Sequence, residues 1–207
     1  MTLILGEISK DVNNHEPLTI ADAQLGSWLR THGSPVLTTF LWIVTSLHST
    51  LAVSCVAVIG GLYLLWRRKP YWLAALWLSV FGGMLLNILL KYVFHRARPH
   101  FDDPILTLTS YSFPSGHTMM ATLLYGVLAA FLVAKTKDWR WRLPVIFLAM
   151  FMIALVGFSR IYLGAHYLSD VLAAMAEGLA WLSLCLTVVY SVWRQRNSHR
   201  NQSPNKL

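Results

Sequence analysis

Long apolar runs bounded by short basic segments dominate this sequence. Four runs, at about 70–93, 116–135, 143–163 and 167–193, approach or exceed the ~20 residues that an α-helix needs to cross the hydrocarbon core of a bilayer. Only 13% of the 207 residues are charged and 56% are hydrophobic, whereas soluble domains carry about 25% charged residues. Because backbone polar groups in lipid must be satisfied within the segment, these runs predict transmembrane helices. We therefore expect an all-α, polytopic helix bundle in a membrane.

The region before residue 70 is less regular. Residues 51–66 predict a fifth clear span and 36–47 a partial sixth, so that 36–66 is either one bent segment or a short helix followed by a span. Within 18–32 the apolar residues recur at helical spacing, which predicts an amphipathic helix, lying either at the membrane interface or as a cap on the bundle. The expected organisation is a tail with this helix at 1–34, a transmembrane domain at 35–193 and a basic tail at 194–207.

The basic residues indicate how the bundle lies in the membrane. Eleven of the 17 lysines and arginines fall on three segments that the spans place on one side, 67–69, 135–142 and 194–206. Short loops rich in Lys and Arg stay in the cytoplasm, and tryptophans gather at membrane interfaces. Tryptophans flank these segments at Trp66, Trp72, Trp139, Trp141 and Trp193. We therefore attribute the net charge of +8 to orientation in the cytoplasmic membrane and not to nucleic-acid binding.

Three polar islands interrupt the apolar sequence between residues 91 and 170, all at the ends of spans that face outward in this topology. The first holds Lys91 and Arg98, which on a continuing helix project from one face because they are two turns apart. Pro99 then ends the helix. An arginine fork and a lysine point charge suit phosphate oxygens. The alternatives are a lysine that snorkels to the interface and an arginine in a loop.

The second island is Pro114-Ser115-Gly116-His117, immediately before an apolar span. A helix N-terminus presents free N–H groups and a positive dipole end, which suit an anion. Gly116 would let the backbone approach a phosphate, Ser115 would add a hydroxyl donor, and His117 could protonate a leaving oxygen. The alternative is an ordinary helix cap beside an interfacial histidine.

The third island begins with Arg160, a third cation, and ends with His166 and Asp170 at positions i and i+4. On a helix this spacing lets the carboxylate hold one ring N–H, which fixes the tautomer and supports the charge that forms when the other nitrogen attacks. A satisfied His–Asp pair at a helix start is the alternative. No metal is expected, because a third protein ligand is missing at standard spacing.

Together, the islands resemble the three-part signature of the type 2 phosphatidic acid phosphatase superfamily, which includes bacterial acid phosphatases and vanadium haloperoxidases. Its pattern is Lys-x6-Arg-Pro, Pro-Ser-Gly-His and Ser-Arg-x5-His-x3-Asp, which 91–170 matches without a substitution. The resemblance implies a helix bundle of that type, with His166 as the nucleophile that forms a phosphohistidine, Asp170 as its orienting partner and His117 as the acid. It further implies that no metal or other cofactor is needed and that phosphate is held by Lys91, Arg98, Ser115, Gly116 and Arg160.

The resemblance implies a lipid phosphatase or diphosphatase whose partners are the bilayer and a lipid phosphate. Small bacterial relatives act on undecaprenyl pyrophosphate, phosphatidylglycerol phosphate or phosphatidic acid. The first is favoured, because the undecaprenyl carrier must be dephosphorylated at the outer face. A lipid phosphotransferase using the same phosphohistidine is one alternative. A non-catalytic anion- or lipid-binding membrane protein is another, although binding alone would need only the cations. A vanadate-dependent peroxidase is disfavoured because its known members are large and soluble.

The chain departs from this pattern in its N-terminal region, and it also carries polar residues that the signature does not include. Membrane members of the superfamily have six spans, so the first of these is expected to be absent or replaced by 18–32 and 36–47. Three further polar residues follow Lys91 without belonging to the signature, and we expect them in a solvated loop: His95, Arg96 and His100.

Overall fold

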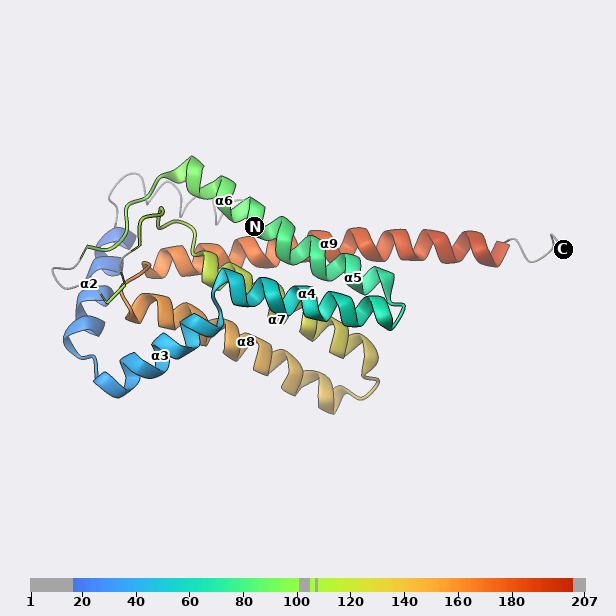
Figure 1. Ribbon diagram of the computed structural model, residues 1–207, viewed down its shortest axis with the longest axis horizontal. Helices are drawn as coiled ribbons and strands as arrows, with labels where there is room; N and C mark the ends of the chain where they lie inside the picture. The colour runs from blue at the N-terminus through green and yellow to red at the C-terminus, as the bar shows by residue number, and fades with distance from the viewer. Residues whose placement is uncertain (1–16, 101–104, 107, 203–207) are drawn as a thin grey trace.

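The computed structural model describes residues 17–100, 105–106 and 108–202, and every regular element within these ranges is helical (Figure 1). The expected tail at 1–16 lies outside the described residues. The elements, in chain order, are α2 (Pro17–Thr31), α3 (Pro35–Leu47), α4 (Thr50–Trp66), α5 (Pro70–Trp77), the π-helical segment η1 (Leu78–Gly82), α6 (Gly83–Phe94), α7 (Gly116–Lys135), α8 (Trp139–Tyr162) and α9 (Leu168–Gln202).

Five units of this bundle are long and apolar enough to cross a membrane. Four are single spans: the continuous run Pro70–Phe94, α7, α8 and the part of α9 up to Ser198. The fifth is the pair α3 and α4, which bends by 47° at the break between them. The prediction of an all-α polytopic bundle is confirmed, and 36–66 forms the two helices α3 and α4, which meet at this bend.

The bend between α3 and α4 follows from local capping. The Ser49 hydroxyl accepts the Ala52 N–H at 3.2 Å, which starts a new helix. His48, which closes α3, has its Nδ1 2.7 Å from the carbonyl oxygen of Val44 and its Nε2 2.6 Å from the hydroxyl of Tyr125 on α7. Both ring nitrogens are therefore engaged, as expected for a buried polar group, and the break is fixed to the bundle.

Helix α2 covers one end of the bundle, where it packs against α8 and α9 (Figure 1). Its Leu29 joins an apolar cluster with Leu41 of α3 and Ile161 of α8. The connection to α3 is held by the backbone N–H of Ser34, which donates to the Tyr162 hydroxyl at 2.9 Å. Helix α2 is thus a cap on the bundle.

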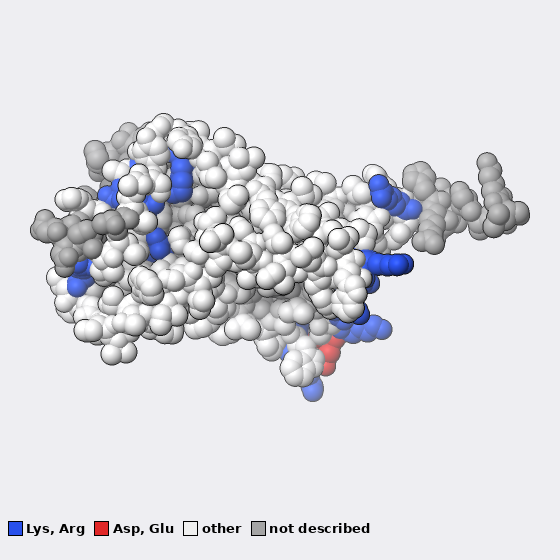
Figure 2. Space-filling view, in the orientation of Figure 1, with Lys and Arg blue, Asp and Glu red and all other residues white. Residues whose placement is uncertain are grey.

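The two ends of the bundle differ in charge. The α4–α5 and α7–α8 turns and the C-terminal part of α9 lie at the end opposite α2 (Figure 1), and lysines and arginines gather there (Figure 2). The three polar islands lie toward the α2 end. Arg194 and Arg196 belong to the last turns of α9, so the basic segment expected as a tail from 194 begins as helix.

Small residues bring the helices of the islands close together, as is common in membrane bundles. A Cβ atom at Gly157 of α8 would lie 2.7 Å from the Val171 side chain of α9. A Cβ atom at Gly178 of α9 would lie 2.9 Å from the Thr122 side chain of α7. These contacts hold α7, α8 and α9 near the residues that carry the second and third islands.

Candidate active site

A pocket of about 290 Å³ lies between the three islands. Six of the eight predicted site residues line it, namely Lys91, Arg98, Gly116, His117, Arg160 and His166. The remaining two are buried next to it: Asp170 lies behind His166, and Ser115 lies at the start of α7. The structure therefore brings residues from α6, α7 and α8 and from two loops to one cavity, with Asp170 of α9 behind it.

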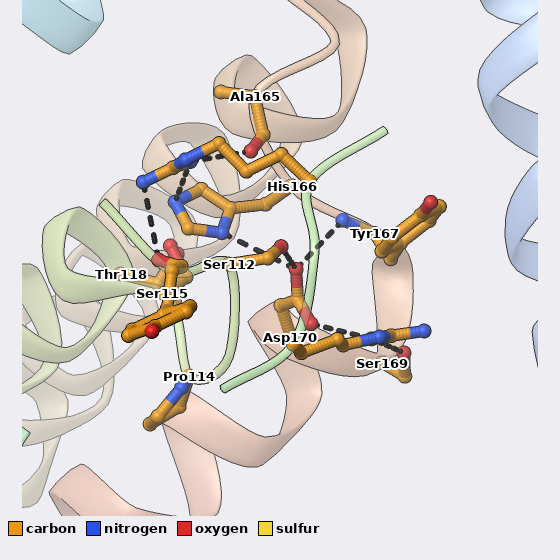
Figure 3. Close-up of polar contacts among 12 residues, drawn as sticks. Ser112, Pro114, Ser115, Thr118, Ala165, His166, Tyr167, Ser169 and Asp170 are labelled. Atoms are coloured by element: carbon orange, nitrogen blue, oxygen red, sulfur yellow. Dashed lines mark hydrogen bonds and ion pairs between the residues drawn. The ribbon is translucent and has the colours of Figure 1, made fainter. Parts of the chain in front are cut away.

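His166 and Asp170 are in contact, but not on one helix face as their spacing predicted, because α9 begins at Leu168 and His166 lies in the turn before it. His166 Nδ1 lies 3.3 Å from Asp170 Oδ2, and the same oxygen accepts the Tyr167 N–H at 3.0 Å and the Ser112 hydroxyl (Figure 3). A carboxylate that only accepts hydrogen bonds places the ring proton on Nδ1. His166 Nε2 is then unprotonated, and it accepts from Arg98 Nη1 at 3.2 Å.

The chain around His166 is folded tightly onto Arg160. The carbonyl oxygen of Arg160 accepts the N–H of Ala165 at 3.0 Å and that of His166 at 3.2 Å. Gly164 has a φ of 70°, a left-handed conformation that glycine adopts without strain. The turn between α8 and α9 therefore fixes the cation and the imidazole relative to each other.

His166 is neutral at physiological pH in this environment. Its burial lowers its pKa to about 4; the hydrogen bond and charge of Asp170 oppose this shift, and the cations Arg160 and Arg98 add to it. A neutral imidazole with its Nδ1 proton held by a carboxylate carries its lone pair on Nε2. In this structure Arg98 Nη1 donates to that lone pair at 3.2 Å.

Lys91 and Arg98 reach the pocket by a different route from the one expected. Helix α6 ends at Phe94, because His95 takes a left-handed conformation with a φ of 48°. The two cations therefore do not share a helix face, which corrects the helical argument from their spacing. They meet instead at the 110–111 segment: Lys91 Nζ donates to the Tyr111 carbonyl at 2.7 Å.

Arg98 donates hydrogen bonds from all three of its guanidinium nitrogens. Its Nε donates to the Ser110 carbonyl at 2.7 Å, its Nη1 to the Ala165 carbonyl at 2.6 Å and its Nη2 to the Ser110 hydroxyl at 2.9 Å. Burial lowers the pKa of this guanidinium, and the charge of Asp170 opposes the change. The fork is therefore fixed in a plane beside His166.

Arg160 keeps a donor free. Its side chain is buried, and Nη1 donates to the Thr45 hydroxyl of α3 at 2.6 Å. Its buried Nε has no hydrogen-bond partner within the described residues. A buried donor without a partner costs free energy, and Arg160 lines the pocket. An anion in the pocket would give this group a partner.

The second island forms the N-terminus of α7. Ser115 precedes the helix, but its side chain makes no capping bond to the backbone and instead lies 3.0 Å from the Thr118 hydroxyl. Gly116 lines the pocket, and a Cβ atom there would approach the Asn87 side-chain oxygen to 3.2 Å. The start of α7 therefore borders the pocket through Gly116 and His117, whereas the Ser115 hydroxyl is engaged with Thr118.

Arg96 was wrongly expected in a solvated loop. It is buried and bonds Asp170, with Nη1 donating to Asp170 Oδ1 and Nη2 donating to Asp22 Oδ2 at 3.0 Å. Ser112 and Ser169 complete this group, and sequence patterns had assigned a role to neither. His95 and His100 are exposed, as expected for a loop.

The fold and the pocket define a class of protein: a multi-pass integral membrane protein with an anion-type pocket, lined by cations and histidines, at one end of its helices. Within the described residues, no three His, Cys, Asp or Glu side chains are grouped as metal ligands. Residues 71–194 match the sequence model of the PAP2 superfamily, and the chain belongs to this superfamily. The resemblance drawn from the three islands is confirmed.

Curated relatives agree with this assignment. The chain is 38% identical over 133 residues to "Phosphatidylglycerophosphatase B" of Bacillus subtilis (strain 168), which covers 63% of this chain and 64% of that protein. It is 32% identical over 130 residues to "Undecaprenyl-diphosphatase" of Sulfolobus acidocaldarius, which covers 60% of this chain and 58% of that protein. The chain thus spans less than two thirds of the length of either relative.

A solved structure extends the likeness to nearly the whole chain. The crystal structure of a transmembrane PAP2 type phosphatidylglycerolphosphate phosphatase from Bacillus subtilis superposes with a TM-score of 0.81, at 29% identity, over 94% of each chain. The bundle described above is therefore the fold of a transmembrane member of the superfamily.

Proposed function

We propose that this chain is a lipid phosphatase that transfers the phosphoryl group of a lipid phosphate to His166 and then to water. One observation carries the proposal: His166, in hydrogen-bond contact with Asp170, lines a pocket together with the cations Lys91, Arg98 and Arg160. Binding an anion needs only the cations. A nucleophile with an orienting carboxylate is the arrangement that covalent catalysis requires.

The proposed reaction has two steps. In the first, the lone pair of His166 Nε2 attacks phosphorus, and the bond between phosphorus and the lipid oxygen breaks as His117 donates a proton to that oxygen. In the second, His117 takes a proton from a water molecule, whose oxygen attacks phosphorus and releases inorganic phosphate and free His166. Asp170 stabilises the positive charge on the phosphorylated ring in between.

The cations have an electrostatic role in both steps. Charge on the phosphoryl oxygens and on the leaving oxygen must be stabilised in the transition state, and fixed donors in a buried site do this most effectively. Arg98 and Arg160 supply fixed forks, Lys91 a point charge and the backbone at Gly116 the helix N-terminus. We propose this neutralisation in place of a metal ion.

The proposed substrate class is a lipid phosphomonoester or diphosphate. Phosphatidylglycerol phosphate is supported by the name of the Bacillus subtilis relative, and undecaprenyl pyrophosphate by that of the Sulfolobus relative. Undecaprenyl pyrophosphate also fits a site at the outer face, where the carrier is dephosphorylated for reuse. A phosphotransferase would share the first step and differ only in the acceptor.

The first test is phosphate release by detergent-purified protein in EDTA, with undecaprenyl pyrophosphate, phosphatidylglycerol phosphate and phosphatidic acid. We expect turnover of at least one lipid at an unchanged rate with and without the chelator. The ranking of kcat/KM then names the substrate. Loss of turnover in EDTA would contradict neutralisation by the protein's own cations. Consumption of lipid without phosphate release would identify the phosphotransferase.

The proposed orientation places the pocket outside the cytoplasmic membrane. Its support is the position of the basic residues: ten of the 17 lysines and arginines fall on 67–69, 135–142 and 194–202. These segments lie at the opposite end of the bundle (Figure 1), which stays cytoplasmic by the positive-inside rule. In a variant without Cys55 and Cys185, a cysteine introduced at the exposed Thr109 should react with an impermeant maleimide added to intact cells. A cysteine at the exposed Lys137 is the control and should react only after lysis. The opposite pattern would reverse the topology.

A further inference from the structure

A buried charge cluster lies behind Asp170, on the side away from the pocket. Arg96 is bonded to two carboxylates, Asp170 of α9 and Asp22 of α2, and the exposed fractions of the three residues are 9%, 0% and 3%. The Tyr167 ring covers the guanidinium at 4.2 Å. Burying charges costs free energy that only good ion-pair geometry and hydrogen bonds offset. The three charged side chains of this cluster meet that condition by bonding one another.

Asp22 also caps the helix that carries Asp170. Its Oδ1 accepts the N–H of Ser169 in the first turn of α9 at 3.0 Å, and its Oδ2 accepts the Ser169 hydroxyl. A carboxylate at a helix N-terminus is favoured by the free N–H groups and the dipole. Asp22 lies outside residues 71–194, the segment that matches the superfamily. Helix α2 thus fixes the start of α9 from outside the matched segment.

We propose that Asp22 and Arg96 are positioning residues for the reaction on His166. Arg96 holds Asp170 by Oδ1 so that Oδ2 faces the imidazole, and Asp22 offsets the charge of Arg96 so that Asp170 keeps its full effect on the ring. This inference rests on the proposed phosphohistidine mechanism. It assigns the capping helix α2 a part in tuning the nucleophile.

The signs of the expected effects follow from the charges around His166. Behind the imidazole lie Asp170 of α9, Arg96 of the loop after α6 and Asp22 of α2. On the pocket side, the charged and titratable groups are Lys91 of α6, Arg98 of the following loop, His117 of α7 and Arg160 of α8. Removing Arg96 leaves two carboxylates near the ring and favours its protonation. Removing Asp22 leaves Arg96 to offset Asp170 and disfavours protonation.

The test measures the pH dependence of kcat/KM in Arg96→Gln, Asp22→Asn and the double variant. The quantity compared is the position of the acid limb, which is the pH at which kcat/KM falls to half on the acid side. Because activity needs neutral His166, wild-type activity should persist at acidic pH and fall near the His166 pKa of about 4. Two lipid substrates with different phosphate pKa values separate this limb from substrate ionisation. We expect Arg96→Gln to shift the acid limb to higher pH by about one unit. In the double variant the limb should return toward its wild-type pH. Asp22→Asn should not raise the limb, and it should lower kcat by about tenfold, because the ring charge that forms is less stabilised.

Asp138→Asn is the matched control, because Asp138 caps α8 at the opposite end by accepting the Arg140 N–H at 3.0 Å; it should leave kcat and the limb unchanged. Arg96→Lys, which keeps the charge, should also leave the limb in place. An unchanged limb in a folded Arg96→Gln variant, or a limb that rises in Asp22→Asn, would overturn the inference. If Arg96→Gln does not fold, the kcat of Asp22→Asn against Asp138→Asn decides. If wild-type protein releases no phosphate, the proposed function fails instead.

Discussion

His166→Ala should abolish phosphate release, with a fall in kcat of about 10⁴-fold or more. The substitution removes the only proposed group that attacks phosphorus, while the cations and the N-terminus of α7 remain to bind substrate. We therefore expect KM to change much less than kcat. Rapid acid-quench experiments with a lipid labelled in its phosphoryl group should show label on wild-type protein and none on the variant. The bond should have the acid lability of a phosphoramidate.

His32→Ala provides the control for this prediction. His32 is exposed at the end of α2, where its ring stacks on Trp28 with centroids 4.6 Å apart. Its loss should leave turnover unchanged. Because His166 is buried, its truncation also leaves a cavity, so thermal unfolding in detergent must show that the variant is folded. A folded His166→Ala variant that retains a tenth of wild-type turnover would exclude His166 as the nucleophile.

Local periodicity explains why the centre of the site could be predicted from the sequence. His166 and Asp170 are four residues apart, and although His166 precedes α9, the turn that leads into the helix keeps the two side chains within 3.3 Å of each other. Lys91 and Arg98 were correctly assigned to one pocket for a partly incorrect reason, since α6 ends before Arg98. The spans were predictable because a bilayer sets both the length and the composition of a crossing helix.

The contacts behind Asp170 could not be predicted in this way. Arg96 and Asp22 are 74 residues apart, and Asp22 and Ser169 are 147 apart. Arg96 lies in an irregular segment, where no period indicates which way a side chain points. Helix α2 was expected to be amphipathic, but no period in the sequence indicates that its polar residue Asp22 is buried against Arg96. Only the tertiary structure shows that these two charges meet.

Arg160→Lys should lower kcat/KM by about 10²- to 10³-fold, although it keeps the positive charge. Arginine presents a rigid planar fork, whereas lysine carries a compact, mobile ammonium group. Arg160 uses Nη1 to bond Thr45 and has an unpartnered, buried Nε. A lysine at this position cannot bond Thr45 and also present a second fixed donor to a phosphoryl oxygen. The effect should fall mainly on kcat, because donors aimed at developing charge act most strongly in the transition state.

Inhibition by orthovanadate, whose trigonal-bipyramidal form resembles a phosphoryl group in transfer, distinguishes this role from simple charge. The affinity for vanadate should fall in Arg160→Lys in proportion to kcat/KM. Arg142→Lys on the same helix is the matched control, since Arg142 donates from Nε to the Thr136 carbonyl at 2.9 Å at the opposite end of α8. This variant should leave kcat/KM and the affinity for vanadate unchanged. If Arg160→Lys instead raises KM and leaves kcat and vanadate affinity intact, Arg160 attracts the substrate only as a charge. In that case Arg98 would be the remaining fork able to bind the transition state, after the opening of its contact with His166 Nε2 that attack by this nitrogen requires in either case.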